Sequence, residues 1–284
     1  MIPAGFEYQR ARTLREALNV LASGDGSKLI AGGHSLIPLL RFRLAQPAKL
    51  VDIGHLAELK GVAAKGRGAR IGAATTYRDL LESELLRERY PLLVEATYSI
   101  GDLQVRNAGT IGGGLAHADP AADMPAVMLA LDAEFVLRGK SGKRSVPARE
   151  FFKGPFTTVL AESEVLTDIV LPPLPRGAGT AYVSFEQKAS GYALAGAAAV
   201  VARSRKTVNH AAVAVTGVGE APYLVAAAST LIGTRGEAED RTAVAAGAVA
   251  GTVNSDIHAP AEYRTQLTRV AVRRALELAL SRAH

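Results

Sequence analysis

The sequence predicts an α+β fold with two parts that meet near residue 175. In the first part, capped amphipathic segments typical of helices are interspersed with short apolar runs joined by glycine-containing turns, which are typical of strands. In the second part, extended segments come first and helical segments follow, an order typical of a small α+β domain of about a hundred residues. The run Pro-Pro-Leu-Pro at 172–175, with glycines at 177 and 179, is the best candidate for the linker.

Composition limits the class of protein. The chain has 284 residues, 48% of them hydrophobic, which is enough for one large or two ordinary domains with real cores. Its 33 basic and 27 acidic residues are dispersed and only 5% of residues are aromatic, which argues against nucleic-acid binding. Without cysteine, the chain itself can hold no disulfide, thiolate-bound metal or cysteine-ligated iron–sulfur cluster. No apolar run approaches the roughly 18 residues of a membrane span, and the N-terminal residues lack the apolar core of a signal peptide, so we expect a cytoplasmic protein.

The first predicted elements lead into a glycine-rich segment. Thr13 and Glu16 form a capping-box pattern for a helix over 14–21, which the glycines at 24 and 26 end. Residues 28–31 are predicted to form a short buried strand that runs directly into Gly32-Gly33-His34-Ser35, and residues 49–53 another strand.

The remaining elements of the first part are predicted in order along the chain. They are a hairpin over 61–64 and 69–74, a short helix capped by Thr76, a helix from Pro91 to residue 100, a helix over 124–131, a hairpin over 134–138 and 144–146, and a strand over 165–171. In the second part we expect strands over 180–187, 195–202 and 208–215, and helices over 222–231, 237–250 and 260–282.

A triple glycine at 112–114 forms the second glycine-rich segment, directly after Thr110-Ile111. Residues without Cβ let a backbone approach a ligand closely and take φ > 0, and a helix start just beyond adds unpaired N–H groups. Alone, this segment is as consistent with a tight loop before a packed helix as with a binding loop. The earlier segment 32–35, whose Ser35 hydroxyl adds a donor, favours a phosphate-bearing ligand. The spacing fits neither the Walker A pattern nor G-x-G-x-x-G.

The charged and titratable candidates lie beside these two segments. His34 and His117 are candidate ligand contacts because of their positions, whereas the other four histidines are predicted to be surface or structural residues: His55, His210, His258 and His284. Asp119 and Asp123 either cap the following helix or accept hydrogen bonds from sugar hydroxyls. No metal-ligand spacing occurs, and Ser35 lacks the G-x-S-x-G context of a nucleophile. We therefore expect no catalytic acid–base pair and no metal site in this chain.

Because it contains both glycine-rich segments, the chain resembles the FAD-binding medium subunits of molybdenum hydroxylases, and most of all the carbon monoxide dehydrogenase medium-subunit group. The residues that carry the resemblance are Ala-Gly-Gly-His-Ser-Leu at 31–36, Val-Arg-Asn-Ala-Gly-Thr-Ile-Gly-Gly at 105–113, His-Ala-Asp-Pro-Ala-Ala-Asp at 117–123, Phe-Phe-Lys-Gly at 151–154 and Ala-Glu-Tyr-Arg at 261–264. The similarity runs essentially end to end.

The resemblance implies a fold and a site. The fold is a two-subdomain FAD-binding domain of the vanillyl-alcohol-oxidase (PCMH) type over 1–175, with subdomains at about 1–56 and 57–175, and a flavoprotein-like α+β C-terminal domain over 177–284. FAD is bound noncovalently, with its phosphates on 31–35 and 110–114, its sugar hydroxyls on Asp123, its adenine or ring system near Leu166 and its isoalloxazine approached by Lys188 and Tyr192. The full set of expected FAD contacts is Ala31, Gly32, Gly33, His34, Ser35, Leu36, Thr110, Ile111, Gly112, Gly113, Gly114, His117, Asp119, Asp123, Leu166, Lys188 and Tyr192.

One position departs from the family pattern. The family usually has asparagine after Thr-Ile-Gly-Gly, whereas this chain has Gly114. Loss of a side-chain amide removes a hydrogen bond typically worth about 0.5–1.5 kcal/mol. We expect either weaker FAD retention or substitution by water or a neighbouring side chain.

The resemblance also implies partners and an activity. A large molybdopterin subunit oxidises the substrate, a small subunit carries two [2Fe–2S] clusters, and this chain passes electrons through FAD to an external acceptor, within a dimer of heterotrimers. The alternative is a non-redox nucleotide-binding or assembly subunit with a degenerate flavin site. The sequence leaves open the substrate and the choice of acceptor among oxygen, NAD and quinone.

Overall fold

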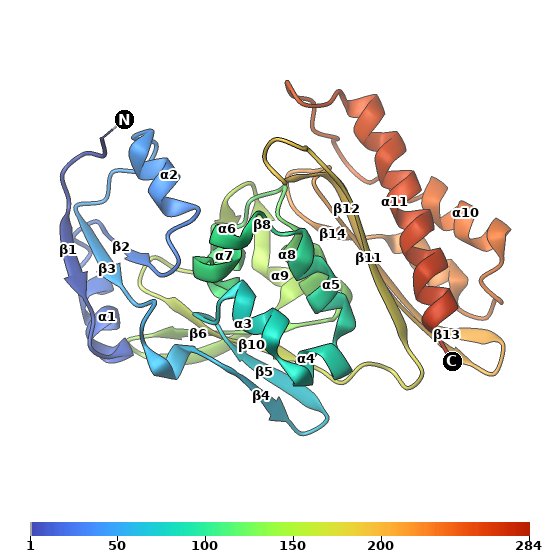
Figure 1. Cartoon of the computed structure of the whole chain (residues 1–284), viewed down its shortest axis with the longest axis horizontal. Coiled ribbons are helices and arrows are strands. Elements are labelled where there is room, and N and C mark those ends of the chain that lie inside the picture. Colours follow the sequence, from blue (N-terminus) through green and yellow to red (C-terminus); the bar gives the residue numbers. More distant parts are fainter. Residues whose placement is uncertain (1) are drawn as a thin grey trace.

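The computed structural model describes residues 2–284 as three adjoining parts, each built on its own sheet (Figure 1). The N-terminal part has a parallel three-stranded sheet in the order β1-β3-β2. Thr13 caps its first helix by accepting a hydrogen bond from Glu16 N at 3.1 Å, as predicted. The elements are β1 (Glu7–Arg10), α1 (Leu14–Leu21), β2 (Ser27–Ile30), α2 (Leu36–Arg41) and β3 (Lys49–Asp52).

The middle part is an antiparallel five-stranded sheet in the order β4-β5-β10-β6-β7, with a layer of short helices on one face (Figure 1). Both predicted hairpins are confirmed as β4–β5 and β6–β7. The strands are β4 (Val62–Lys65), β5 (Gly68–Gly72), β6 (Glu134–Gly139), β7 (Gly142–Pro147), β8 (Phe152–Gly154), β9 (Thr157–Thr158) and β10 (Val165–Leu171). The helices are α3 (Tyr77–Glu82), α4 (Glu84–Arg89), α5 (Pro91–Ser99), α6 (Leu103–Ala108), α7 (Ile111–His117), α8 (Asp123–Ala130) and α9 (Ala148–Phe151).

The C-terminal part is an antiparallel sheet, β11-β12-β13-β14, with helices on both faces. Along β12, Ala198 and Val200 belong to the core shared with α5 and α8, whereas Ala197 and Ala199 belong to the core under α11. This alternation follows the two-residue period of a strand, so one sheet joins two cores. The elements are β11 (Gly179–Glu186), β12 (Ala193–Ser204), β13 (Thr207–Thr216), β14 (Tyr223–Leu224), α10 (Ala238–Ala246) and α11 (Ala261–Arg282).

The predicted helix over 222–231 is wrong. Tyr223 and Leu224 instead pair with Val215 and Ala214 as an edge strand, and a 3₁₀ helix over Ala226–Leu231 follows. Pairing with the exposed edge of β13 satisfies backbone groups that local sequence patterns cannot anticipate. The next helix, predicted over 237–250, ends at residue 246.

The segment between the second and third sheets is held in place although it is rich in proline. The Tyr90 hydroxyl donates to the carbonyl oxygens of Leu171 (3.2 Å) and Pro172 (2.8 Å). Glu95 on α5 accepts hydrogen bonds from Tyr182 N at 3.0 Å and from Arg282 Nη1 at 3.1 Å. The third part is therefore docked on the helices of the second. Among residues 2–284, no helix is both long and apolar enough to cross a bilayer.

Candidate cofactor site

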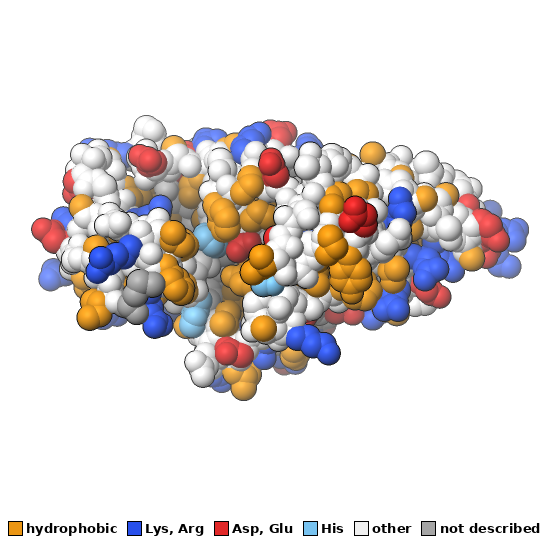
Figure 2. Space-filling view, turned by 90° about the horizontal axis from the view of Figure 1, so that it is seen from above, with side chains coloured by type: hydrophobic (Ala, Val, Ile, Leu, Met, Phe, Trp, Pro, Cys, Tyr) orange, Lys and Arg blue, Asp and Glu red, His pale blue; other side chains and the backbone are white. Residues whose placement is uncertain are grey.

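A cavity of about 1100 Å³ lies between the N-terminal part and the helices of the middle part. Its walls include residues 27–36 of the N-terminal part, the start of α7 and α8, and the loop with Ser190, Gly191 and Tyr192 from the C-terminal part. Figure 2 shows the molecule hollowed at this place, with histidine side chains on the walls. All three parts of the chain therefore contribute to one site.

The segment after β2 presents a row of free backbone donors. The chain turns at Gly33, whose φ is +74°, and reaches Ser35, which precedes α2 with φ −94° and ψ −44°. Within residues 2–284, the N–H groups of 32–36 have no protein acceptor, although Ile37 N donates to Gly33 O at 2.8 Å. Successive N–H groups in such a turn form a concave site for an anion. These donors line the large cavity, so a phosphate-bearing ligand fits this wall.

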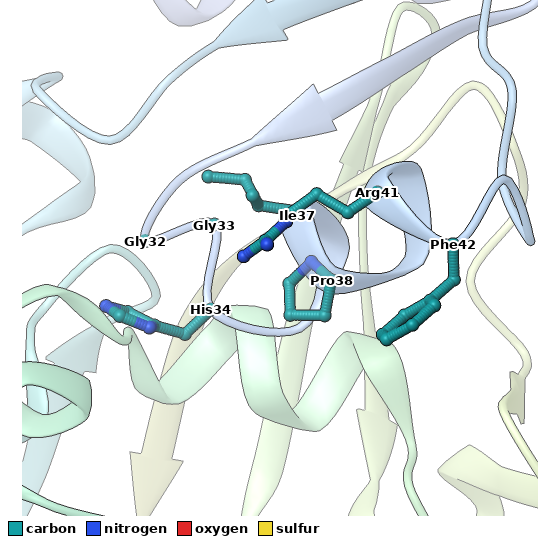
Figure 3. A pocket seen from close by; sticks show the side chains of 7 residues that line it. All are labelled: Gly32, Gly33, His34, Ile37, Pro38, Arg41 and Phe42. Atoms are coloured by element: carbon teal, nitrogen blue, oxygen red, sulfur yellow. The ribbon is translucent and has the colours of Figure 1, made fainter. Parts of the chain in front are cut away.

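A smaller pocket of about 330 Å³ lies beside the same loop, against α2 (Figure 3). Its lining includes Ile37, Pro38 and Phe42, and the Arg41 side chain extends back toward Gly33 and His34. The guanidinium adds a positive charge beside the loop, which favours an anion there.

The triple glycine does not form the loop that the sequence predicts. It lies in the first turns of α7, and none of its φ angles is positive. The backbone N–H groups of the first turn of α7 are all bonded within the protein: Ile111 N to Thr75 O, Gly112 N to Ala73 O, Gly113 N to Thr110 Oγ1 and Gly114 N to Thr110 O, at 2.8–3.2 Å. This segment can contact a ligand through its exposed surface but offers it no first-turn amide.

Two glycines instead allow close packing of protein against protein. A Cβ at Gly32 would overlap Ala108 O and lie 2.7 Å from Gly109 Cα, and a Cβ at Gly112 would overlap Ala73 Cβ. The first glycine brings the N-terminal loop onto the residues just before α7, and the second brings α7 onto the end of β5. The two walls of the cavity meet because these positions have no side chain.

The end of α7 forms a second corner of the cavity. Ala118 takes the left-handed conformation (φ 51°, ψ 45°) and its carbonyl accepts from Phe156 N at 2.9 Å. The Phe156 ring lies 5.0 Å from the His117 ring, centroid to centroid. Burial lowers the pKa of His117 despite the opposing effect of Asp119, so the imidazole is neutral at neutral pH. Asp119 Oδ1 accepts from Ala121 N at 2.9 Å, so this side chain stabilises the turn that leads into α8.

Asp123 is the most perturbed carboxyl group in the cavity. It is the first residue of α8 and is 6% exposed. The Tyr182 hydroxyl of β11 donates to it. Burial raises its pKa to about 7, because the hydrogen bond from Tyr182 only partly compensates for the lost hydration of the carboxylate. The charge of Asp123 therefore changes near neutral pH.

Two family models match consecutive stretches of the chain. The FAD binding domain in molybdopterin dehydrogenase matches residues 4–174. The CO dehydrogenase flavoprotein C-terminal domain matches residues 180–279. The chain belongs to the FAD-binding medium subunits of molybdenum hydroxylases. The predicted family and fold class are confirmed, and this flavoprotein is one component of an oxidoreductase.

Relatives and solved structures agree with this membership. The chain is 41% identical over 287 residues to the carbon monoxide dehydrogenase medium chain of Hydrogenophaga pseudoflava, covering 99% of each. It is 43% identical over 223 residues to the glyceraldehyde dehydrogenase medium chain of Sulfolobus acidocaldarius, covering 78% of this chain and 79% of the relative. The structure of carbon monoxide dehydrogenase from H. pseudoflava superposes with a TM-score of 0.97 over 100% of both chains at 41% identity. Quinoline 2-oxidoreductase from Pseudomonas putida 86 gives a TM-score of 0.93 at 31% identity, with 99% of each chain covered.

The cavity of this FAD-binding subunit fits the chemistry of its cofactor. The free N–H groups of 32–36 suit a pyrophosphate, which carries negative charge and many acceptor oxygens. Beyond them the lining becomes mixed, with Leu166, Phe156 and Met124 beside His117 and Asp123. A long ligand with a charged middle and aromatic ends matches such a gradient.

The structure brings most of the expected FAD contacts to the cavity. Those that line it are Ala31, Gly32, Gly33, His34, Ser35, Leu36, Thr110, Gly112, Gly113, Gly114, His117, Asp119, Asp123, Leu166 and Tyr192. Two do not. Ile111 is fully buried in the core beneath α7, and Lys188 is exposed in the turn between β11 and β12.

Sequence reasoning missed other residues of the lining. Tyr77, Phe156 and Lys28 all line the cavity. Lys28 comes four residues before the first glycine and could have been noticed as a cation on the strand that leads to a phosphate loop. Tyr77 and Phe156 carry no such signal, because tertiary packing alone brings α3 and the segment after β8 to α7.

Proposed function

We propose that this chain holds FAD in the cavity and passes electrons from [2Fe–2S] clusters of a small partner subunit to an external acceptor. A large molybdopterin-binding subunit oxidises the substrate. The observation that carries the proposal is the row of free N–H groups at 32–36, opposite α7 in a chain that belongs to an FAD-binding family.

The residues of this chain bind and orient the cofactor. The amides of 32–36 and the Ser35 hydroxyl hold the pyrophosphate, and Asp123 accepts hydrogen bonds from sugar hydroxyls. Tyr192, on the rim contributed by the third part, lies at the isoalloxazine end. When bound, FAD would supply the redox chemistry, since a flavin takes up electrons one at a time from such clusters and releases them one or two at a time. The chain excludes water from the covered part of the ring and sets its distance from the partner.

Composition supports the division of labour between subunits. The chain contains no cysteine, so any cysteine-ligated cluster that feeds the flavin belongs to another chain. We infer a dimer of heterotrimers in the cytoplasm, with an FAD-binding domain over 1–175 and a C-terminal domain over 177–284. Overall sequence identity does not identify the substrate of the complex, because relatives at 41% and 43% identity are named for carbon monoxide and for glyceraldehyde.

The test is to co-express the chain with its small cysteine-rich and large molybdopterin-binding subunits and to purify the complex. We expect a complex that releases one FAD per medium chain on heat denaturation. After the complex has been reduced, one of oxygen, NAD or a quinone should re-oxidise its flavin. A complex that releases no flavin, even after incubation with FAD, contradicts the proposal and favours a non-redox assembly subunit. Light scattering of the same sample measures the stoichiometry.

A further inference from the structure

The phenol of Tyr77 lies in the space that a side chain at position 114 would take. A Cβ built on Gly114 would overlap Tyr77 Oη, and Tyr77 Cζ would be 3.6 Å away. Apart from the backbone of α7 itself, no other described atom comes within 4 Å of that Cβ. The Tyr77 hydroxyl thus occupies the space that is free because Gly114 has no side chain.

Contacts on three sides fix the position of Tyr77. It is the first residue of α3, directly after the capping residue Thr76, and its backbone N donates to Gly109 O at 3.0 Å. A bridge between Thr76 and Thr110 ties this point to the start of α7. The ring also passes over Gly109, where an added Cβ would lie 3.2 Å from Cδ2 and Cε2. The ring therefore packs on Gly109 while its hydroxyl lies over Gly114.

The Tyr77 side chain is buried, but its hydroxyl opens onto the cavity and has no hydrogen-bond partner among residues 2–284. The residue is 7% exposed and lines the cavity, and no described group lies in hydrogen-bonding geometry with Oη. Burial raises the pKa of the Tyr77 phenol well above its usual value, with further contributions from Asp123 and Tyr192. The phenol therefore keeps its proton and remains a donor at physiological pH. Buried tyrosine hydroxyls usually have a hydrogen-bond partner, which here must come from the contents of the cavity.

We propose that Tyr77 Oη donates a hydrogen bond to an oxygen of bound FAD and replaces the side chain that Gly114 lacks. The inference rests on the proposed function, since it assumes FAD in this cavity. The hydroxyl lies over Gly114 of α7, in the same cavity as the 32–36 loop and Asp123, so the proposed acceptor is an oxygen of the ribityl–pyrophosphate stretch. Tyr77 is thereby a cofactor-binding residue from α3, outside both glycine-rich segments.

The geometry makes the two positions interdependent. An asparagine at 114 collides with the hydroxyl while Tyr77 is present. After Tyr77→Phe, the ring atom nearest to the added Cβ is Cζ at 3.6 Å, an ordinary van der Waals separation, so the Cβ of the asparagine no longer overlaps the ring. Gly114→Asn should therefore harm FAD binding in the wild-type background and be tolerated, or restore binding, in the Tyr77→Phe background.

The experiment compares four forms of the complex: wild type, Tyr77→Phe, Gly114→Asn and the double variant. Each is stripped of flavin and titrated with FAD, and its flavin-free melting temperature is measured. Tyr77→Phe should raise the Kd for FAD about 2- to 13-fold, the range for one neutral hydrogen bond, without changing the flavin-free melting temperature. The double variant should bind FAD more tightly than Gly114→Asn alone, which is the signature of coupled sites. Tyr98→Phe, at a tyrosine that is 65% exposed and outside the cavity, is the matched control and should leave the Kd unchanged.

Titration with riboflavin and FMN identifies the acceptor. If Tyr77→Phe weakens all three ligands, the acceptor is on the ribityl chain, and if it spares riboflavin, the acceptor is a phosphate oxygen. An unchanged Kd for FAD in Tyr77→Phe, with a wild-type complex that binds FAD, overturns this inference and leaves the proposed function standing. Multiplicative effects of the two substitutions also overturn it. A wild-type complex that does not bind FAD overturns both.

Discussion

Replacement of Ser35 by alanine should weaken FAD binding without weakening the fold. Ser35 stands at the N-cap of α2, a position where loss of a serine usually costs about 1 kcal/mol because the side chain caps the helix. Here the side chain makes no cap hydrogen bond, and within residues 2–284 its Oγ has no other partner. The stability of the flavin-free protein should therefore change by less than about 0.5 kcal/mol.

The same hydroxyl is placed to donate to a phosphate of FAD. A hydrogen bond to a charged group contributes about 1.5–3 kcal/mol, so its loss should raise the Kd for FAD roughly 10- to 150-fold. The backbone amides of 32–36 remain in the variant, so binding should be weakened and not abolished.

Two measurements separate the outcomes. Urea unfolding of the flavin-free chain gives its stability, and titration of the stripped complex with FAD, followed by flavin fluorescence, gives the Kd. Ser141→Ala, in the exposed turn between β6 and β7 and outside the cavity, is the matched control and should change neither. A Kd for Ser35→Ala within twofold of wild type would refute the assignment of this loop to the pyrophosphate.

Two further substitutions test the packing and the charge of the site. Gly112→Ala places a methyl group against Ala73 Cβ and 2.7 Å from Ala73 O, so it should destabilise the chain by about 1–3 kcal/mol in urea unfolding, whereas Gly154→Ala, whose added Cβ has no neighbour within 4 Å, should not. Asp123→Asn should stabilise the flavin-free chain relative to wild type, and more at high pH. Because the pKa of Asp123 is raised from 3.8 to about 7 on folding, the stability present below pH 4 is lost as pH rises through 7. Between pH 5 and pH 8 the wild type should lose roughly 2–3 kcal/mol more than the variant, as measured by urea unfolding at both pH values.

Each of these has a clear contrary result. Equal stability of Gly112→Ala and Gly154→Ala would mean that α7 can move away from the end of β5 at no cost. A pH dependence that Asp123→Asn leaves intact would assign the titration to another group.

The fold was predictable where local patterns determine it. Thr13 as the N-cap specified α1, although Glu16 accepts from Arg12 N and so does not complete the predicted capping box. Apolar runs around glycine turns specified both hairpins of the middle sheet. The order β4-β5-β10-β6-β7 was not predictable, because it pairs strands about a hundred residues apart and depends on packing with the helices above. Local patterns also favoured a helix at 222–231, where pairing with the edge of β13 prevails.

The sequence predicted that two glycine-rich segments form the site, but not which of their backbone groups are free to contact a ligand. Sequence patterns placed 31–36 and 110–114 together, and the cavity includes both. They could not show that the triple glycine is helical, since glycine costs about 1 kcal/mol relative to alanine inside a helix. The cap from Thr110 and the bonds of Ile111 and Gly112 to Thr75 and Ala73 offset that cost, and these are tertiary interactions. Tyr77 reached the cavity for the same reason.

The walls of the cavity come from distant stretches of the chain, from residue 21 to residue 192. A chain emerges from the ribosome N-terminus first, and its domains fold as units while synthesis continues. While residues 190–192 are still unmade, a nascent chain lacks the part of the cavity wall that the third part of the chain contributes. The cavity is complete only after residue 192 has been translated, and ribosome-stalled chains that end before it should bind FAD more weakly than the full chain.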